Sequence, residues 1–247
     1  MSGHSKWATI RRKKEKLDAA RGRVFSSLIK EITIAARMGG GDPVGNPRLR
    51  TAIDSAKLAN MPASNIDRAI KKGTGDLPGV SYEEIVYEAY GPGGTALLIE
   101  TFTDNRNRTT GELRHMMSKH GGNMAEAGSV GWMFSRKTLV TVPEEGVVED
   151  DLLMVALEVG ADDVKHEDGT FQVTAAPEKL DEIRQAIENA GFKIEQAEVA
   201  RIPQTEVLVE GNQANQLLRL MEVVEDHDDV QKVWSNFDVP ETMLEEE

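Results

Sequence analysis

The chain has 247 residues, of which 39% are hydrophobic and 29% are charged, and its formal net charge is -13. This length predicts two or three domains, and this composition is typical of a globular protein. The lack of cysteine excludes disulfides, thiolate zinc sites, iron–sulfur clusters and a cysteine nucleophile. No apolar run approaches the ~18 residues of a membrane span, so we expect no membrane partner.

Charge is distributed unevenly along the chain. Residues 1–76 contain 16 Lys and Arg against 7 Asp and Glu, which gives 16 − 7 = +9, whereas the remainder gives 13 − 35 = −22. A phosphate backbone would be attracted by the first part and repelled by the rest. This separation predicts a polyanion, and specifically a nucleic acid, as the partner.

The first 23 residues form a basic arm without a steady apolar period. We expect either a mobile arm or a helix that forms only on a partner, with its cations against phosphates and its tryptophan stacked on an unpaired base. The alternatives are a solvated tail and a tryptophan packed on the next domain. The residues assigned to nucleic-acid binding here are Lys6, Trp7, Arg11, Arg12, Lys13, Lys14, Lys16, Arg21 and Arg23.

Three helices are predicted after the arm. Apolar residues at helical spacing indicate helices at 24–38, at 47–59 with Asn46 as N-cap, and at 62–73 with Gly73 as the stop. We expect the third helix to extend the phosphate-binding site through three cations: Arg68, Lys71 and Lys72.

A hairpin and another helix come next. Alternating and apolar runs predict strands at 81–90 and 96–102, and Thr109 with Glu112 has the spacing of a capping box. A further strand is predicted at 130–134.

The start of that helix has the sequence DNRNR, at residues 104–108. Free backbone N–H groups together with Arg106 and Arg108 would bind an anion, and Arg114 would continue the basic surface. The alternative is simple helix capping, with the arginines paired to carboxylates.

The second half predicts a ferredoxin-like unit. Between residues 137 and 203 the order is βαββαβ, with helices at 150–159 and 177–190. The elements beyond it, including a strand at 230–237, are expected to return and complete the sheet begun at Tyr82. The fold class is therefore α+β: a helical domain at 1–76, a discontinuous α+β domain at 80–136 and 204–240, and an inserted ferredoxin-like domain at 137–203.

No constellation indicates catalysis. The histidines are scattered, no phosphate-binding loop motif occurs, and the acidic residues lie in runs such as 226–229, which we interpret as solvated surface. We therefore expect no enzyme activity, no metal, no cofactor and no small-molecule substrate.

Several strings, taken together and in order, resemble the YebC/PmpR family across essentially the whole chain. They are GHSKW (3–7), GGGDP (39–43), NPRLR (46–50), NMPASNIDRAIKKGTG (60–75), YEEIVYEAYGPGG (82–94), DNRNRT (104–109) and GSVGWMF (128–134). The resemblance implies three domains and a cytoplasmic, DNA-binding transcriptional regulator. The family also includes a mitochondrial translational activator, and bacterial relatives have been linked to ribosomes. The resemblance therefore implies, as the alternative, a ribosome-associated translation factor that binds rRNA or tRNA. The residues alone leave a further alternative open, an acidic protein–protein adaptor.

Overall fold

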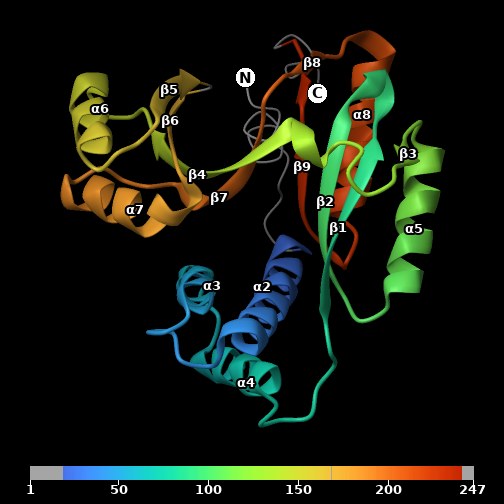
Figure 1. The fold of residues 1–247 in the computed structure, drawn as a ribbon, viewed down its shortest axis with the longest axis horizontal. Helices are drawn as coiled ribbons and strands as arrows, with labels where there is room; N and C mark the ends of the chain where they lie inside the picture. The colour runs from blue at the N-terminus through green and yellow to red at the C-terminus, as the bar shows by residue number, and fades with distance from the viewer. Residues whose placement is uncertain (1–18, 168, 241–247) are drawn as a thin grey trace. The chain divides into compact units, whose positions relative to one another are not determined.

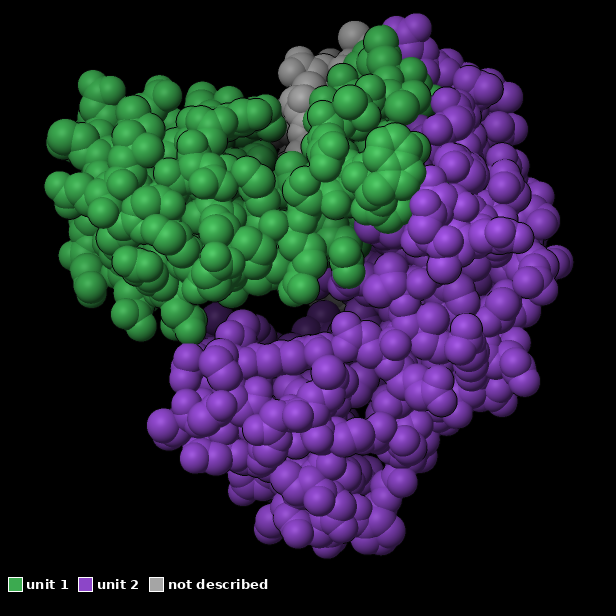
Figure 2. All heavy atoms as spheres, viewed as in Figure 1, with its two compact units in different colours: residues 1–10, 130–209, 234–247 green, residues 11–129, 210–233 purple. Residues whose placement is uncertain are grey.

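A computed structural model describes residues 19–167 and 169–240, with side chains from Val24 onward. These residues form helices and mainly antiparallel sheets, which confirms the predicted α+β class. They divide into two compact units (Figure 2). In the described part of the chain, unit 1 comprises residues 130–209 and 234–240, and unit 2 comprises residues 19–129 and 210–233. The division into three domains stays a prediction.

Three helices of unit 2 pack around one apolar core (Figure 1): α2 (Ala19–Gly39), α3 (Pro47–Leu58) and α4 (Ala63–Thr74). Asn46 caps α3 as predicted, because its Oδ1 accepts a hydrogen bond from Leu49 N at 3.1 Å. Its Nδ2 also donates to Ala35 O at 2.8 Å, so one buried amide joins α2 to α3. The core includes Ile32, Ala36, Leu49, Ile53, Ala56, Ile66 and Ala69.

The end of α4 differs from the prediction. The helix continues past Gly73 to Thr74, and Gly75 adopts the left-handed conformation at φ 88°. Gly73 serves close packing instead, since a Cβ placed there would lie 2.4 Å from Thr33 O and 2.8 Å from Ala36 Cβ. A residue without a side chain lets α4 approach α2 this closely.

A four-stranded sheet has the order β3-β1-β2-β9. Strands β1 (Glu83–Tyr90) and β2 (Ala96–Thr103) form the predicted antiparallel hairpin, and β3 (Asn123–Met124) is short. Strand β9 (Val230–Ser235) lies beside β2, which confirms that the chain returns to complete this sheet. Helices α5 and α8 contact each other beside the sheet (Figure 1), and their bounds are Arg106–Lys119 and Gly211–Glu225.

The second four-stranded sheet lies in unit 1 and has the order β5-β6-β4-β7 with antiparallel neighbours, which confirms the ferredoxin-like arrangement. Helices α6 and α7 pack with it over a core that includes Val140, Leu152, Val173, Ile183 and Ile187. The elements are β4 (Phe134–Pro143), α6 (Glu149–Glu158), β5 (Asp163–Glu167), β6 (Thr170–Ala175), η3 (Pro177–Lys179), α7 (Leu180–Asn189) and β7 (Gln196–Pro203).

The predicted strand at 130–134 is wrong. Gly131–Met133 forms a 3-10 turn, η2, and β4 begins only at Phe134. A separate parallel pair in unit 1 joins β8 (Val207–Leu208) to β10 (Phe237–Asp238). Within the described ranges, no helix combines the length and the apolar character needed to cross a membrane.

Candidate nucleic-acid interface

Most of the basic arm lies outside the described residues. This applies to Lys6, Trp7, Arg11, Arg12, Lys13, Lys14 and Lys16. Arg21 and Arg23 belong to the first turns of α2, where the backbone alone is described. Because α2 begins at Ala19 rather than at the predicted residue 24, the last part of the basic segment is helical.

The outer face of α4 presents a cluster of cations. Arg68, Lys71 and Lys72 are exposed, whereas Ile66 and Ala69 on the opposite side are buried. Residues three and four apart lie on one face of a helix, so these three side chains share a surface. Within the described ranges they form no ion pair, which leaves their charge available to a phosphate.

The start of α5 is built differently from the prediction. The N-cap is Asn105, whose side chain accepts a hydrogen bond from Arg108 N at 3.1 Å, so the capping box at Thr109 is wrong by one helical turn. Thr109 is buried instead, with its Oγ1 2.7 Å from Thr103 Oγ1 and 2.8 Å from Asp229 Oδ2.

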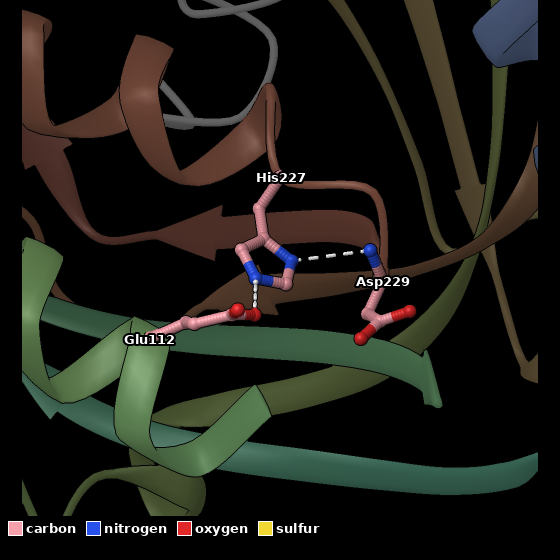
Figure 3. Close-up of side chains that lie close together, drawn as sticks. All are labelled: Glu112, His227 and Asp229. Atoms are coloured by element: carbon pink, nitrogen blue, oxygen red, sulfur yellow. Dashed lines mark hydrogen bonds and ion pairs between the residues drawn. The ribbon is translucent and has the colours of Figure 1, made fainter. Parts of the chain in front are cut away.

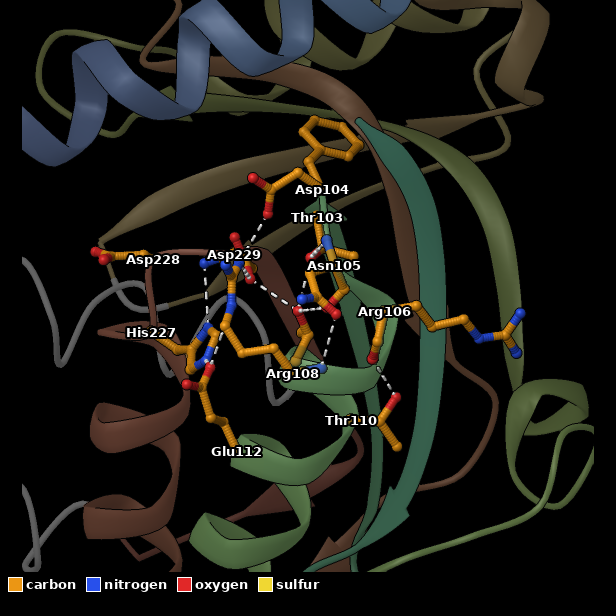
Figure 4. A network of polar contacts seen from close by, with 12 residues as sticks. Thr103, Asp104, Asn105, Arg106, Arg108, Thr110, Glu112, His227, Asp228 and Asp229 are labelled. Carbon is orange, nitrogen blue, oxygen red and sulfur yellow. Dashed lines mark hydrogen bonds and ion pairs between the residues drawn. The ribbon is translucent and has the colours of Figure 1, made fainter. Parts of the chain in front are cut away.

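The three arginines of this region do not form one anion site. Arg108 Nη2 donates to Asp229 Oδ2 at 2.6 Å and to Asp104 Oδ1 at 3.0 Å, which is the carboxylate-paired alternative that the sequence left open. The hydrogen bond to Asp229 raises the pKa of Arg108. Arg106 points away from these carboxylates (Figure 4), and Arg114 is exposed farther along α5.

A buried carboxylate connects α2 to the sheet of unit 2. Asp229 Oδ1 accepts a bond from Lys30 Nζ at 3.1 Å, and the same ammonium donates to Asp228 O at 2.8 Å and to Phe102 O at 3.3 Å. Lys30 belongs to α2, Phe102 to β2, and Asp229 to the turn that precedes β9. One lysine therefore fixes α2 onto β2 and onto the turn that leads into β9.

The charge of Asp229 is stabilised by these contacts. Its side chain is 5% exposed. Burial by itself would raise the pKa of Asp229, but hydrogen bonds from Arg108, Thr109 and Lys30 outweigh it and lower the pKa to about 2. Asp229 is therefore ionised at neutral pH. Its donors lie on two helices, Lys30 on α2 and Arg108 and Thr109 on α5, so that this one carboxylate positions both helices.

His227 and Glu112 extend this network (Figure 3). His227 Nδ1 accepts a bond from Asp229 N at 3.1 Å, and Nε2 lies 2.8 Å from Glu112 Oε2. Because Nδ1 acts as an acceptor, the proton resides on Nε2 and is donated to the carboxylate. Glu112, His227 and Asp229 each offer one possible metal-ligand atom, and these three atoms lie within 4.8 Å of one another. A metal ion fits poorly here, since both ring nitrogens are engaged and Asp229 already faces two cations.

Two arginines, Arg48 and Arg37, connect the helices of unit 2 to one another and to the start of β1. Arg48 Nε donates to Glu31 Oε1 at 2.7 Å and Arg48 Nη1 to Glu84 Oε2 at 2.8 Å. Arg37 Nη1 donates to Tyr82 O at 2.8 Å. These contacts and the Asp229 network together hold α2 and α3 on the sheet of unit 2.

Sequence reasoning missed the Asp229 network. The run at 226–229 was predicted to be solvated, but Asp229 is 4% exposed. Its one local signal is its place directly before the apolar strand that starts at Val230. Nothing near Lys30 in the sequence indicates this contact either, because its partner lies 199 residues away.

Comparison with known proteins agrees with this architecture. Residues 5–76 match the sequence model of the TACO1/YebC protein N-terminal domain, and residues 82–237 match that of the TACO1/YebC second and third domain. A probable transcriptional regulatory protein of Geobacter sulfurreducens is 56% identical over 99% of both chains. Another, from Pelotomaculum thermopropionicum, is 55% identical over 97% of this chain and 99% of its own.

A solved structure is also similar. The crystal structure of a conserved hypothetical protein from Aquifex aeolicus is 47% identical, covers 91% of this chain and 93% of its own, and superposes with a TM-score of 0.84. Two matched sequence models that span most of the chain, full-length relatives and a shared fold lead to one conclusion: the chain belongs to the TACO1/YebC family.

Proposed function

We propose that this protein is a cytoplasmic, non-enzymatic regulator of transcription that binds DNA through its basic arm and the cationic face of α4. The observation that carries the proposal is the +9 charge of residues 1–76 in a chain whose net charge is -13. Arg68, Lys71 and Lys72 display part of that charge on one exposed helix face. The names of the bacterial relatives, probable transcriptional regulatory proteins, support the regulatory role.

A translation factor that binds ribosomal RNA or tRNA is the second candidate. Base reading in a DNA groove needs side chains that reach base edges, and Asn65 is the amide on α4 suited to adenine. Asn65 is half-buried, whereas the three cations around it are fully exposed. Such a face favours phosphate contacts over base contacts, and phosphate contacts serve structured RNA equally well.

Charge reversal on α4 tests the proposed surface. The variant Arg68→Glu/Lys71→Glu/Lys72→Glu should weaken binding to a mixed-sequence DNA duplex roughly 100-fold at low salt. Loss of three phosphate contacts should also reduce the slope of log K against log salt by about 2.7. Fluorescence anisotropy across a salt series measures both quantities.

The control is Lys119→Glu/Lys165→Glu/Lys193→Glu, which makes the same change in net charge at exposed positions outside α4. Equal losses in both variants would show that net charge alone matters and would remove α4 from the site. Sedimentation of lysate with and without RNase, together with footprinting on promoter DNA, then separates the candidates. RNase-sensitive migration with ribosomes supports translation, discrete protected promoter sites support transcription, and a salt-resistant protein partner alone supports the adaptor.

A further inference from the structure

One segment of unit 1, residues 144–190, carries most of the excess negative charge. Residues 144–190 contain 3 Lys and Arg against 14 Asp and Glu, so that this segment alone contributes 3 − 14 = −11 to a total of -13. It includes both helices of the ferredoxin-like unit, α6 and α7. Nucleic acid would be repelled from such a surface, and a cationic protein segment would be attracted to it.

Apolar side chains are exposed in the middle of this acidic surface, along α6. Met154 is 61% exposed and Leu157 is 51% exposed, and Val148, the residue before the helix, is 58% exposed. The core does not need these side chains, since α6 already buries Leu152 and Ala156 in it. Single exposed apolar residues are ordinary, but two that are three positions apart form a continuous strip on one helix face.

Carboxylates border the strip at both ends. Asp150 and Glu158 lie four residues before and after Met154, in the same row of the helix. Acidic residues in the first turn of a helix stabilise it, which explains Asp150. Glu158 lies in the last turn, where a negative charge interacts unfavourably with the helix dipole. Within the described ranges neither carboxylate takes part in an ion pair, so both are available to a partner.

We propose that α6 binds a basic amphipathic segment of another protein. The apolar residues of that segment would cover Met154 and Leu157, and its lysines or arginines would pair with Asp150 and Glu158. Methionine suits such a surface because its flexible thioether adapts to different apolar side chains. The small size of the strip predicts a transient, micromolar contact. This protein-binding role is additional to nucleic-acid binding.

A defined peptide tests the proposal. The probe is an 18-residue amphipathic peptide of leucine and lysine with leucines at helical spacing, and the comparison peptide has the same composition in scrambled order. The full chain should bind the probe and not the scrambled peptide. Met154→Ser/Leu157→Ser should raise the Kd about tenfold, because two apolar side chains lose their contact. Asp150→Asn/Glu158→Gln should raise it severalfold and reduce its salt dependence.

The matched control is Val44→Ser/Leu58→Ser, which alters two exposed apolar residues of unit 2 and should leave the Kd unchanged. Hydrogen exchange should show protection by the probe at residues 149–158. Equal binding of the scrambled peptide, equal losses in both serine variants, or protection elsewhere would overturn the proposal. So would a dimer of the free chain in sedimentation velocity that Met154→Ser/Leu157→Ser dissociates, since the occupant would then be a second copy. DNA affinity of this variant should match wild type, so failure here leaves the nucleic-acid proposal intact.

Discussion

At the scale of single residues, Asp229 determines how α2 is held. A carboxylate whose side chain is 5% exposed is costly unless it is paired, and Asp229 is paired with Lys30, Arg108 and Thr109 at distances of 2.6 to 3.1 Å. Removing this one charge leaves Lys30 without its carboxylate and takes from Arg108 the shorter of its two carboxylate hydrogen bonds. The side chain is therefore more important to the fold than its position in an acidic run suggests.

The variant Asp229→Asn should lower the free energy of unfolding by about 3 kcal/mol at pH 7, because it breaks a buried ion pair. The folded-state pKa of Asp229 is lowered to about 2 from an ordinary 3.8, so the stabilisation is fully present above about pH 4 and is lost as the pH falls through 2. Urea unfolding of both proteins between pH 7 and pH 2.5 measures the difference, which should shrink in acid. A difference that is independent of pH would contradict this account of Asp229.

At the scale of elements, the contact between α2 and α4 depends on the missing side chain of Gly73. Gly73→Ala should destabilise the protein by about 2 kcal/mol, although alanine favours helices, because its Cβ would meet Thr33 O at 2.4 Å. The control Gly111→Ala, at an exposed position of α5 with nothing within 4 Å of its Cβ, should stabilise by up to about 1 kcal/mol. Thermal unfolding of both variants measures whether each substitution lowers or raises the Tm. A Gly73→Ala variant with a raised Tm would contradict the packing argument.

Elements with strong local signals could be predicted from the sequence. The cap at Asn46, the hairpin of β1 and β2 and the βαββαβ order rest on short-range patterns, and the structure confirms them. The strand expected at 130–134 was wrong because apolar residues alone do not distinguish a strand from a 3-10 turn at Gly131. The cap at Thr109 was wrong because that threonine is held by a residue 120 positions away.

The candidate site was only partly predictable, because some of its contacts join residues that are distant in the sequence. The exposed face of α4 follows from helical periodicity, so Arg68, Lys71 and Lys72 could be assigned to the surface. Pairing of Arg108 with a carboxylate was one of two alternatives, but Asp229 could not be identified as the partner, since it is distant in sequence and near only in the folded chain. Long-range ion pairs leave no periodic signal.

At the scale of the whole molecule, the proposed function depends on the separation of charge along the chain. Reversing Arg11, Arg12, Lys13 and Lys14 to Glu should abolish DNA binding at physiological salt and lower the salt slope by about 3.6 if all four contact phosphates. Urea unfolding should be unchanged. Normal binding by this variant would contradict a role for the arm, whereas a shifted unfolding midpoint would indicate that these residues stabilise the fold instead.

The position of β9 at the edge of the β3-β1-β2-β9 sheet also has a consequence for biosynthesis. A ribosome must translate past residue 230 before β2 gains this neighbour and before Lys30 meets its carboxylate, 199 residues later in the chain. Until then the nascent chain contains its basic arm, but the ion pair between Lys30 and Asp229 that holds α2 on the sheet has not formed. The anchored form of α2 is therefore acquired only after residue 230 has been translated, and a chain that stops before that residue leaves β2 without this neighbour.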